Sequence, residues 1–409
     1  MKKKLMVIVS FIFVLITVIS CSGLIDDSTN NTQNNIVNNV TNEITNKVVN
    51  YEEITVEDLQ TAVQTATKRV ENASVGVSLK NVTSGSGYTE SEDVIAIGTG
   101  VIYKYEEVKE NGKLVNYKYY VMTNRHVITS DKYKDTKVFI YLGNEDKEIE
   151  ATVLGYDNKV DIACLTFNHY TYIQPVEFSD SDLLEKGTFV IAVGNPGGYE
   201  YYGSVTFGVV SAPLRYLADD TDNDGTNDYY ASYIQHDASI NPGNSGGGLF
   251  TLDGKLIGIN TLKIVQDEVD NMGFSIPSNQ VKIILENYLE KGIAILRPTL
   301  GIKAYELKNM TPYVVEQLGL MPIPNIYEPG ERQYGLYVNE FVVGGSLYNS
   351  GIKIHDIVLA IDDIKIKESS QLSALLNNLS SYSVGTEVKI TYYSRSSNSI
   401  KDVTVILKK

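Results

Sequence analysis

The chain has 409 residues, of which 43% are hydrophobic, so its length predicts two globular domains with sizeable cores. Its formal net charge is −15. This excess of carboxylates argues against binding to nucleic acid, which needs clustered Lys and Arg, and against binding to anionic lipid surfaces.

Residues 1–21 have the pattern of a bacterial lipoprotein signal peptide. Lysines at positions 2–4 precede an apolar run from Leu5 to Ile19, as in a secretory signal. The run ends in VISCS, where Cys21 resembles the lipobox cysteine that becomes the lipidated first residue. The alternative is an uncleaved anchor, although about 15 apolar residues are few for a membrane span. We therefore expect a protein that is lipid-anchored at the cell membrane and faces outside the cytoplasm, at the cell surface or in the periplasm.

Residues 22–50 are rich in Asn and Thr and poor in aromatic residues, a composition typical of a disordered tether. After the tether, Thr55 and Asp58 have the spacing of a capping box and are followed by apolar residues at helical intervals. This pattern predicts a helix from about Val56 to Val70.

Short β-type runs separated by Gly, Asn and Asp extend from Ala73 to about Pro277, which predicts an antiparallel barrel or sandwich. One run, DIACLTF, contains Cys164, which we expect to be a buried, small apolar residue. If Cys21 is lipidated, Cys164 has no partner and no internal disulfide is expected. The segment Val281 to Gly292 is predicted to be a helix that a glycine terminates.

The run GNSGG contains Ser245 and fits two classes of serine hydrolase. In α/β-hydrolases the histidine follows the serine, but the sole histidine after Ser245 is His355, far downstream in a second region. In chymotrypsin-like proteases the order is His, Asp, Ser. TNRHVI supplies His126 and NKVDIACL supplies Asp161, both in strand-like segments before Ser245. Chain order therefore favours the chymotrypsin-like arrangement.

With these motifs in place, the chain from about Ala73 to Lys409 resembles the HtrA/Deg (high-temperature-requirement) serine proteases. The resemblance implies a mainly β fold, in which a chymotrypsin-like double β-barrel at residues 51–292 precedes an α+β PDZ domain at residues 297–409. It also implies a homotrimer that acts in protein quality control. The matching runs are IGTGVI, TNRHVI, DNKVDIACL, VIAVGNPGG, VTFGVVS, YIQHDASINPGNSGGGLF, GKLIGIN and MGFSIPS.

Acyl transfer needs backbone amides that point at the developing oxyanion, and side chains on the glycines around Ser245 would obstruct that approach. We expect the amides of Gly243 and Ser245, with Asn244 between them, to form the oxyanion hole. His126 would take the proton of Ser245, and Asp161 would hold the histidine in the right tautomer. Asp157, the competing carboxylate, lies in a turn where Asp is favoured for local hydrogen bonds.

The residues before the nucleophile bear on activation and specificity. Asn244 stands where trypsin-like zymogens use an Asp to bind a newly cut N-terminus, so activation by such cleavage is not expected. Ser239 stands where trypsin has the Asp that selects basic residues. With Ile240 and Ile264 as the expected substrate-binding residues, the pocket should favour small or medium apolar side chains. Lys263 complicates this prediction unless its ammonium reaches water.

The sequence contains three further histidines. His169 is expected to be an exposed loop residue, and His355 to lie exposed on a turn. His236 stands where most relatives carry threonine; it is either a packed histidine or a modest influence on pH dependence.

An acidic loop, Asp220 to Asp228, has alternating aspartates before a glycine, as in calcium-binding loops. The usual twelfth-position Glu is missing, since Ala231 stands there, and a solvated acidic turn is the alternative. We assign no metal site and no cofactor.

In the second region, Leu300, Gly301 and Ile302 match the PDZ loop whose amides bind a chain-terminal carboxylate, with the peptide added to the sheet edge. The insert MPIPNIYEPGERQ is longer than is usual at this place in the family. Together these features predict a serine endopeptidase that degrades unfolded or misfolded exported proteins. The alternative is a PDZ-containing chaperone or scaffold with a mostly latent protease site.

Overall fold

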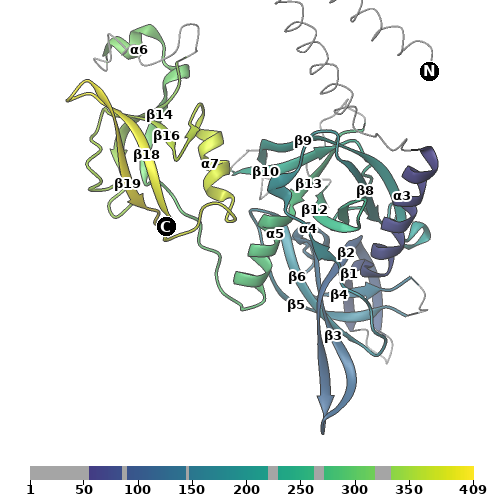
Figure 1. Cartoon of the computed structure of the whole chain (residues 1–409). Coiled ribbons are helices and arrows are strands. Elements are labelled where there is room, and N and C mark those ends of the chain that lie inside the picture. The colour runs from purple at the N-terminus through teal and green to yellow at the C-terminus, as the bar shows by residue number, and fades with distance from the viewer. Residues whose placement is uncertain (1–54, 85–89, 144–146, 220–228, 262–270, 318–332) are drawn as a thin grey trace, which may run out of the picture. The chain divides into compact units, whose positions relative to one another are not determined.

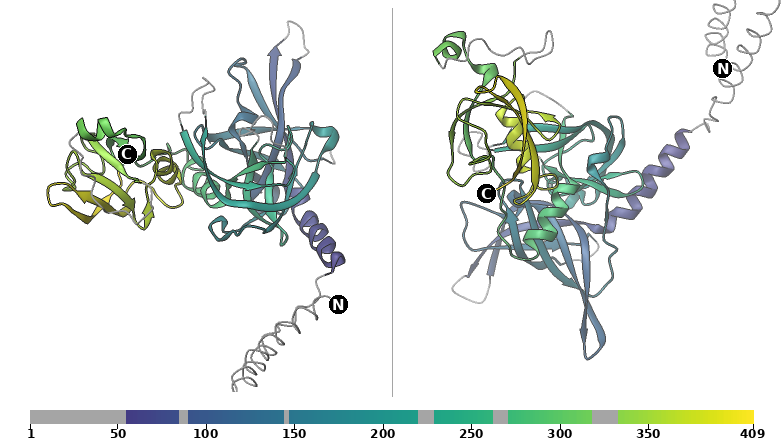
Figure 2. Two further views of the ribbon diagram at one scale, coloured as in Figure 1. Left: turned by 90° about the horizontal axis from the view of Figure 1, so that it is seen from above. Right: turned by 60° about the vertical axis from the view of Figure 1, so that its left-hand side comes forward.

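The computed structural model describes residues 55–84, 90–143, 147–219, 229–261, 271–317 and 333–409 (Figures 1 and 2). The chain divides into two units, Met1–Leu59 and Gln60–Lys409. The signal peptide, Cys21, the tether, the Asp220–Asp228 loop, Lys263 and Ile264 lie outside the described residues. Within the described part, no helix is both long and apolar enough to cross a membrane.

The predicted first helix is confirmed as α3, Val56–Val70. Its capping box is formed: the Thr55 amide donates to Asp58 Oδ2 at 2.8 Å, and the Asp58 amide donates to Thr55 Oγ1 at 3.1 Å. These bonds satisfy backbone donors that a helix start leaves unpaired. A 3-10 turn, Glu71–Ala73, leads from the helix into the first strand.

Six strands close into an antiparallel barrel in the order β1-β2-β3-β6-β5-β4. Its interior is filled by apolar residues that alternate along the strands, among them the fully buried Val75, Val121 and Leu165. Cys164 is also fully buried there, as predicted. The strands are β1 Ser74–Ser84, β2 Glu90–Glu110, β3 Lys113–Asn124, β4 Thr136–Tyr141, β5 Ile149–Asp157 and β6 Ile162–His169.

A second sheet has the order β11-β8-β9-β10-β13-β12-β7, and an additional β11–β12 pairing closes six of these strands into a ring. The predicted mainly β fold with two barrels is therefore confirmed. Helix α5, Ser278–Ile284, follows and continues as a π-helical turn, Leu285–Leu289. The strands are β7 Glu177–Phe178, β8 Phe189–Gly194, β9 Ser204–Asp219, β10 Tyr229–His236, β11 Gly248–Thr251, β12 Lys255–Thr261 and β13 Gly273–Pro277.

The chain after Arg297 forms a third sheet, in the order β14-β15-β16-β18-β19 with β17 beside β16. Two helices accompany it, and residues such as Val338, Leu347 and Ile390 give it a buried core of its own. The elements are β14 Ile302–Glu306, α6 Pro312–Gln317, β15 Leu336–Phe341, β16 Ile357–Ile361, β17 Ile364–Lys365, α7 Ser369–Asn377, β18 Glu387–Ser394 and β19 Ser399–Ile406.

Two local predictions differ from the structure. His126 lies in a single helical turn, α4 Arg125–Ile128, and not on a strand. The carbonyl of Asp161 accepts two hydrogen bonds, from the amide of Arg125 and from the side chain of Asn124. These bonds lie where β3 ends and the helical turn begins. The helix predicted from Val281 already starts at Ser278.

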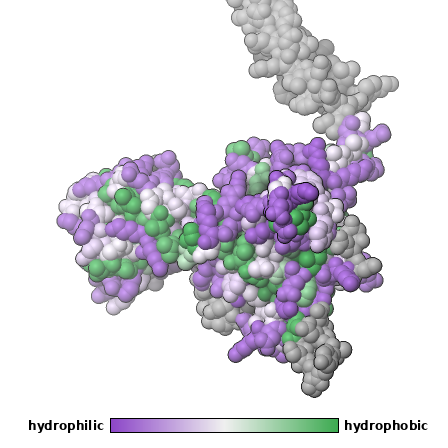
Figure 3. Space-filling view, turned by 90° about the horizontal axis from the view of Figure 1, so that it is seen from below, coloured by the Kyte–Doolittle hydropathy of each residue, from purple (hydrophilic) through white to green (hydrophobic). Residues whose placement is uncertain are grey.

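The surface of the molecule is mostly hydrophilic on the face that can be seen in Figure 3. On the face that Figure 3 displays, hydrophilic residues cover much of the surface and apolar residues are scattered in smaller groups.

Candidate active site

The two barrels bring His126, Asp161 and Ser245 together from three segments. Antiparallel pairing of β3 with β6 sets Asn124 opposite Ile162, so Asp161 lies beside the start of α4. Ser245 precedes β11 in the second barrel. His126 and Ser245 line one pocket of about 400 Å³, together with Ala96, Ile97, Val127, Pro242 and Gly243.

The carboxylate of Asp161 holds His126 at two points. Oδ2 lies 2.6 Å from the ring Nδ1, and Oδ1 accepts the backbone amide of His126 at 2.9 Å. The Asp161 side chain is 5% exposed, whereas that of His126 is 37% exposed. A carboxylate on Nδ1 keeps the proton on that nitrogen, so Nε2 is left as the proton acceptor on the open side.

The backbone around Ser245 is arranged to present amides. The carbonyl of Pro242 accepts the Gly197 amide at 2.8 Å. Because the C=O and N–H of a trans peptide point in opposite directions, the Gly243 amide points away from Gly197. Among the described residues, the Gly243 and Ser245 amides donate to no acceptor, whereas the Asn244 amide donates to the Asn241 carbonyl at 2.9 Å. The two amides expected to form the oxyanion hole, those of Gly243 and Ser245, are therefore available, whereas the amide of Asn244 between them is not.

Gly243 has a φ of 103°, and a Cβ at this position would lie 2.1 Å from the carbonyl oxygen of Asn195. A side chain is excluded both by the dihedral and by the space. This close approach accounts for the glycine at this point in the GNSGG run.

A buried threonine ties the nucleophile loop to the first barrel. Thr99 Oγ1 donates to the Gly243 carbonyl at 2.7 Å and accepts the Asn195 amide at 3.0 Å. The Thr99 amide donates to the Ser245 carbonyl at 2.9 Å. Sequence reasoning gave no role to Thr99 or Asn195, although both stand in runs, IGTGVI and VIAVGNPGG, that carry the resemblance.

The expected specificity pocket is described only in part. Ile240 is half-buried and packs against an apolar cluster that includes Ile234 and Ala238. The Ser239 carbonyl accepts the Thr206 hydroxyl at 3.0 Å. Ile264 and Lys263 lie outside the described residues, so the contribution of these two residues stays a prediction.

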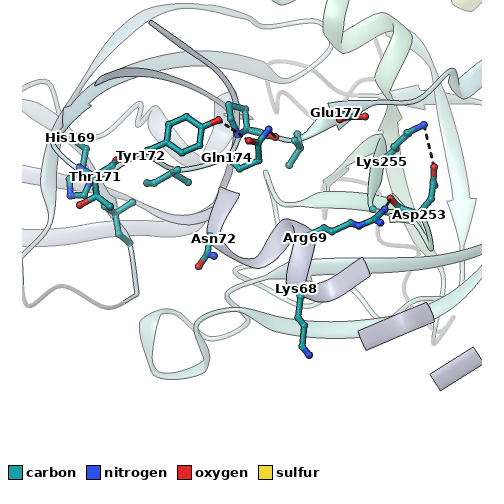
Figure 4. A pocket seen from close by; sticks show the side chains of 15 residues that line it. Lys68, Arg69, Asn72, His169, Thr171, Tyr172, Gln174, Glu177, Asp253 and Lys255 are labelled. Carbon is teal, nitrogen blue, oxygen red and sulfur yellow. Dashed lines mark hydrogen bonds and ion pairs between the residues drawn. The ribbon is translucent and has the colours of Figure 1, made fainter. Parts of the chain in front are cut away.

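A larger pocket of about 870 Å³ contains none of the predicted site residues (Figure 4). Its charges are mixed: Lys68 and Arg69 come from α3, and Lys255 pairs with Asp253 at 3.4 Å. His169, which is half-buried rather than exposed, lies at one end. Across the described part of the chain, no group of three His, Cys, Asp or Glu residues could hold a metal ion.

In the third sheet, β14 is an edge strand, and Leu300, Gly301 and Ile302 lead into it. The carbonyls of Leu300 and Gly301 accept the amides of Leu347 and Val342 at 3.0 and 2.8 Å. Among the described residues, the amides of Leu300 and Gly301 have no acceptor. His355 is exposed, as predicted, with its Nδ1 on the hydroxyl of Tyr337.

Comparison with known proteins identifies the family. Residues 98–259 match the trypsin-like peptidase domain. The serine protease Do-like HtrA of Bacillus subtilis (strain 168) is 34% identical over 336 residues, which cover 82% of this chain and 68% of that protein. The chain belongs to the HtrA family of serine proteases. As a member of this family with a trypsin-like peptidase domain, it is a serine-type endopeptidase.

The serine protease Do-like HtrA of Lactobacillus helveticus is 36% identical over 298 residues, which cover 72% of this chain and 64% of that protein. The match thus spans about two thirds of the length of these HtrA relatives. Among solved structures, the HtrA-type protease AlgW with a decapeptide has a TM-score of 0.57 at 23% identity, with 85% of this chain and 98% of that chain covered. At this identity the similarity concerns the fold.

Proposed function

We propose that this HtrA-family chain works outside the cytoplasm and degrades unfolded or misfolded exported proteins, with Ser245 as the nucleophile, His126 as the general base and Asp161 as its orienting partner. The observation that carries the proposal is the Asp161–His126 contact of 2.6 Å at the pocket that Ser245 also lines.

In the proposed reaction, Ser245 Oγ attacks the scissile carbonyl carbon while His126 Nε2 takes the hydroxyl proton. The amides of Gly243 and Ser245 stabilise the oxyanion. His126 then gives the proton to the leaving amine, and an acyl-enzyme forms on Ser245. Water, activated by the same histidine, releases the second product and restores the serine. Asp161 keeps its charge throughout and stabilises the imidazolium.

The proposed substrates are extended segments of unfolded chains with a small or medium apolar residue before the cleaved bond. Support comes from Ile240, which lies among apolar residues and carries no charge to select a basic side chain. The pocket of about 400 Å³ at Ser245 also has the apolar residues Ile97 and Val127 in its lining, which supports an apolar substrate segment.

For residues 297–409 we propose a PDZ domain that binds peptide C-termini. Leu300 and Gly301 offer free amides next to the edge strand β14, where a peptide can add as a further strand. A related HtrA-type protease was solved with a decapeptide. The signal peptide pattern and Cys21 support a lipid anchor, and family membership supports a homotrimer.

The test is cleavage of casein by the full-length chain. The native protein should degrade casein, and Ser245→Ala should not, while Ser381→Ala, an exposed serine of the third sheet region, should match the native protein. A native chain that prevents aggregation of unfolded proteins yet leaves casein intact would favour the chaperone or scaffold alternative instead.

A further inference from the structure

His236 is a buried histidine close to the nucleophile loop. It ends β10, and its exposed fraction is 0%. A Cβ built on Gly273 would lie 2.5 Å from its Cε1 and 3.0 Å from Cγ1 of Ile240, so the ring lies near the expected specificity pocket. The proposed mechanism uses His126 and leaves His236 without a role.

The ring is joined to a short chain of hydrogen bonds across β13 and β12, which follow β10 in the sheet (Figure 1). Its Nε2 lies 3.0 Å from Ser275 Oγ, and Ser275 Oγ donates to Asn260 Oδ1 at 2.8 Å. Because the serine hydrogen goes to Asn260, Ser275 must accept its second bond from an Nε2–H of His236. Nε2 therefore carries a hydrogen, and in the neutral ring Nδ1 is the unprotonated nitrogen.

Asn260, at the other end of this chain, contacts each of the three glycines after Ser245. Its carbonyl accepts the Gly246 amide at 3.0 Å, and its own amide donates to the Gly247 carbonyl at 2.8 Å. Its side-chain Nδ2 donates to the Gly248 carbonyl at 3.1 Å. The side chain of Asn260 is oriented by Ser275, so the chain of bonds runs from His236 to the backbone that carries the nucleophile.

We propose that His236 is a positioning residue: as a neutral Nε2–H donor it holds Ser275 and Asn260, and through them the loop Gly246 to Gly248, and its protonation in acid favours opening of that loop. The inference rests on the proposed role of Ser245 as the nucleophile.

Protonation would place a charge on a buried ring, and the cost of removing this charge from water outweighs the stabilisation that nearby groups provide. Nδ1 is buried and has no hydrogen-bond partner among the described residues. Burial lowers the pKa of His236 to about 4, while the backbone of Ala238 and the carboxylate of Asp237 oppose this shift. The neighbours that β13 and β9 set beside the ring, Gly273, Ser275 and Val210, do not titrate. Within the described part of the chain, Asp237 is the charged residue whose electrostatic field raises the pKa of His236.

The sign of the effect follows from this lowered pKa. An opened loop with a solvated His236 binds the proton near pH 6.5, whereas the closed loop binds it near pH 4. The closed loop is therefore most stable above about pH 6.5. It loses stability progressively as the pH falls toward about 4. Between about pH 7.5 and about pH 5, linkage predicts that the opening equilibrium rises about 30-fold.

Hydrogen exchange of the full-length chain, followed by mass spectrometry and corrected for intrinsic rates, measures this opening without any cleavage reaction. In the native chain, protection of the Gly246–Gly248 amides should fall about 30-fold from about pH 7.5 to about pH 5. The backbone amide of Leu165, in the first barrel, serves as an internal reference, and its protection should not follow this change. In His236→Gln, which keeps a donor but cannot titrate, protection of the loop should stay level.

Two further variants complete the test. Ser275→Ala keeps the histidine but breaks the chain of bonds, so protection of the loop should be low at every pH. His169→Gln, a histidine remote from this network, should behave as the native chain. A His236→Gln loop that still loses protection in acid, a Ser275→Ala loop protected as in the native chain, or an equal loss at Leu165 would each overturn the proposal. Casein cleavage that persists in Ser245→Ala would count against the proposed function but would leave the exchange result standing.

Discussion

Thr99 reaches across the barrel interface to Gly243, where its hydroxyl donates to the glycine carbonyl at 2.7 Å. The side chain is fully buried and also accepts the Asn195 amide. Through these two bonds, Thr99 connects Gly243, two residues before the nucleophile, to Asn195 in the connection between β8 and β9. The orientation of the Gly243 amide depends on both segments, because Gly197 of that connection donates to the Pro242 carbonyl.

Thr99→Val should therefore lower kcat for peptide cleavage by about 10-fold to 100-fold, which is less than the loss of a whole oxyanion donor. Valine preserves the volume but leaves the Gly243 carbonyl and the Asn195 amide without this partner, at about 1–3 kcal/mol for each buried group. Steady-state kinetics of the purified protein measure the effect. Thr99→Ser, which retains the hydroxyl, is the control, and a Thr99→Val enzyme with native kcat would contradict the role given to this bond.

Asp161→Asn should reduce kcat by about ten-thousand-fold, while Ser245→Ala and His126→Ala should reduce it by about a million-fold. The asparagine Oδ1 would keep the bond to the His126 amide, so its NH2 group would face Nδ1. That NH2 group donates a hydrogen and forces the proton onto Nε2, which can no longer accept one.

Two rates test the predicted losses of kcat in these three variants: the rate of casein cleavage, and the rate of reaction with a serine-directed phosphonylating reagent. Asp182→Asn, an exposed carboxylate, is the control and should keep native rates. If Asp161→Asn behaves like Asp182→Asn, the assignment of the orienting carboxylate is wrong.

Elements and site residues that a short run of neighbouring residues defines could be predicted from the sequence. The helix Val56–Val70 follows from its capping box and periodicity, and His126, Asp161 and Ser245 each stand in a short, recognisable run. The bonds that hold the site join residues far apart in the chain, such as Thr99 to Gly243, and no local pattern encodes a pairing of that kind. The helical turn at His126, where the sequence predicts a strand, has a similar cause: Arg125 and Asn124 bond to the carbonyl of Asp161, which is distant in the chain.

Cys21→Ser should abolish fatty-acid labelling of the protein in cells, because the cysteine thiol is the proposed site of lipid attachment. Cys164→Ser should keep the label, since that thiol is fully buried in β6. Metabolic labelling with a fatty acid, followed by purification, measures both variants side by side. Labelling that persists in Cys21→Ser would show that the N-terminal segment is not a lipoprotein signal.

Arg297 and Asp157 form an ion pair that is largely shielded from water. Their side chains are 16% and 3% exposed, and Asp157 Oδ1 also accepts the Lys159 amide at 3.0 Å. The two neighbouring carboxylates thus have separate partners: Asp157 pairs with Arg297, after the π-helical turn, and Asp161 pairs with His126. Breaking a buried pair leaves one charge unpaired, which costs about 3–5 kcal/mol.

Arg297→Met should therefore lower the melting temperature clearly, and Asp157→Asn should do so as well. Calorimetry of the full-length chain gives both values, and the double variant Asp157→Leu with Arg297→Met should recover most of the loss, because no unpaired charge remains. Lys303→Ala removes a cation from the exposed pair with Glu340, whose side chains are 67% and 55% exposed, and should leave the melting temperature unchanged. If Arg297→Met melts like Lys303→Ala, the pair does not stabilise the fold.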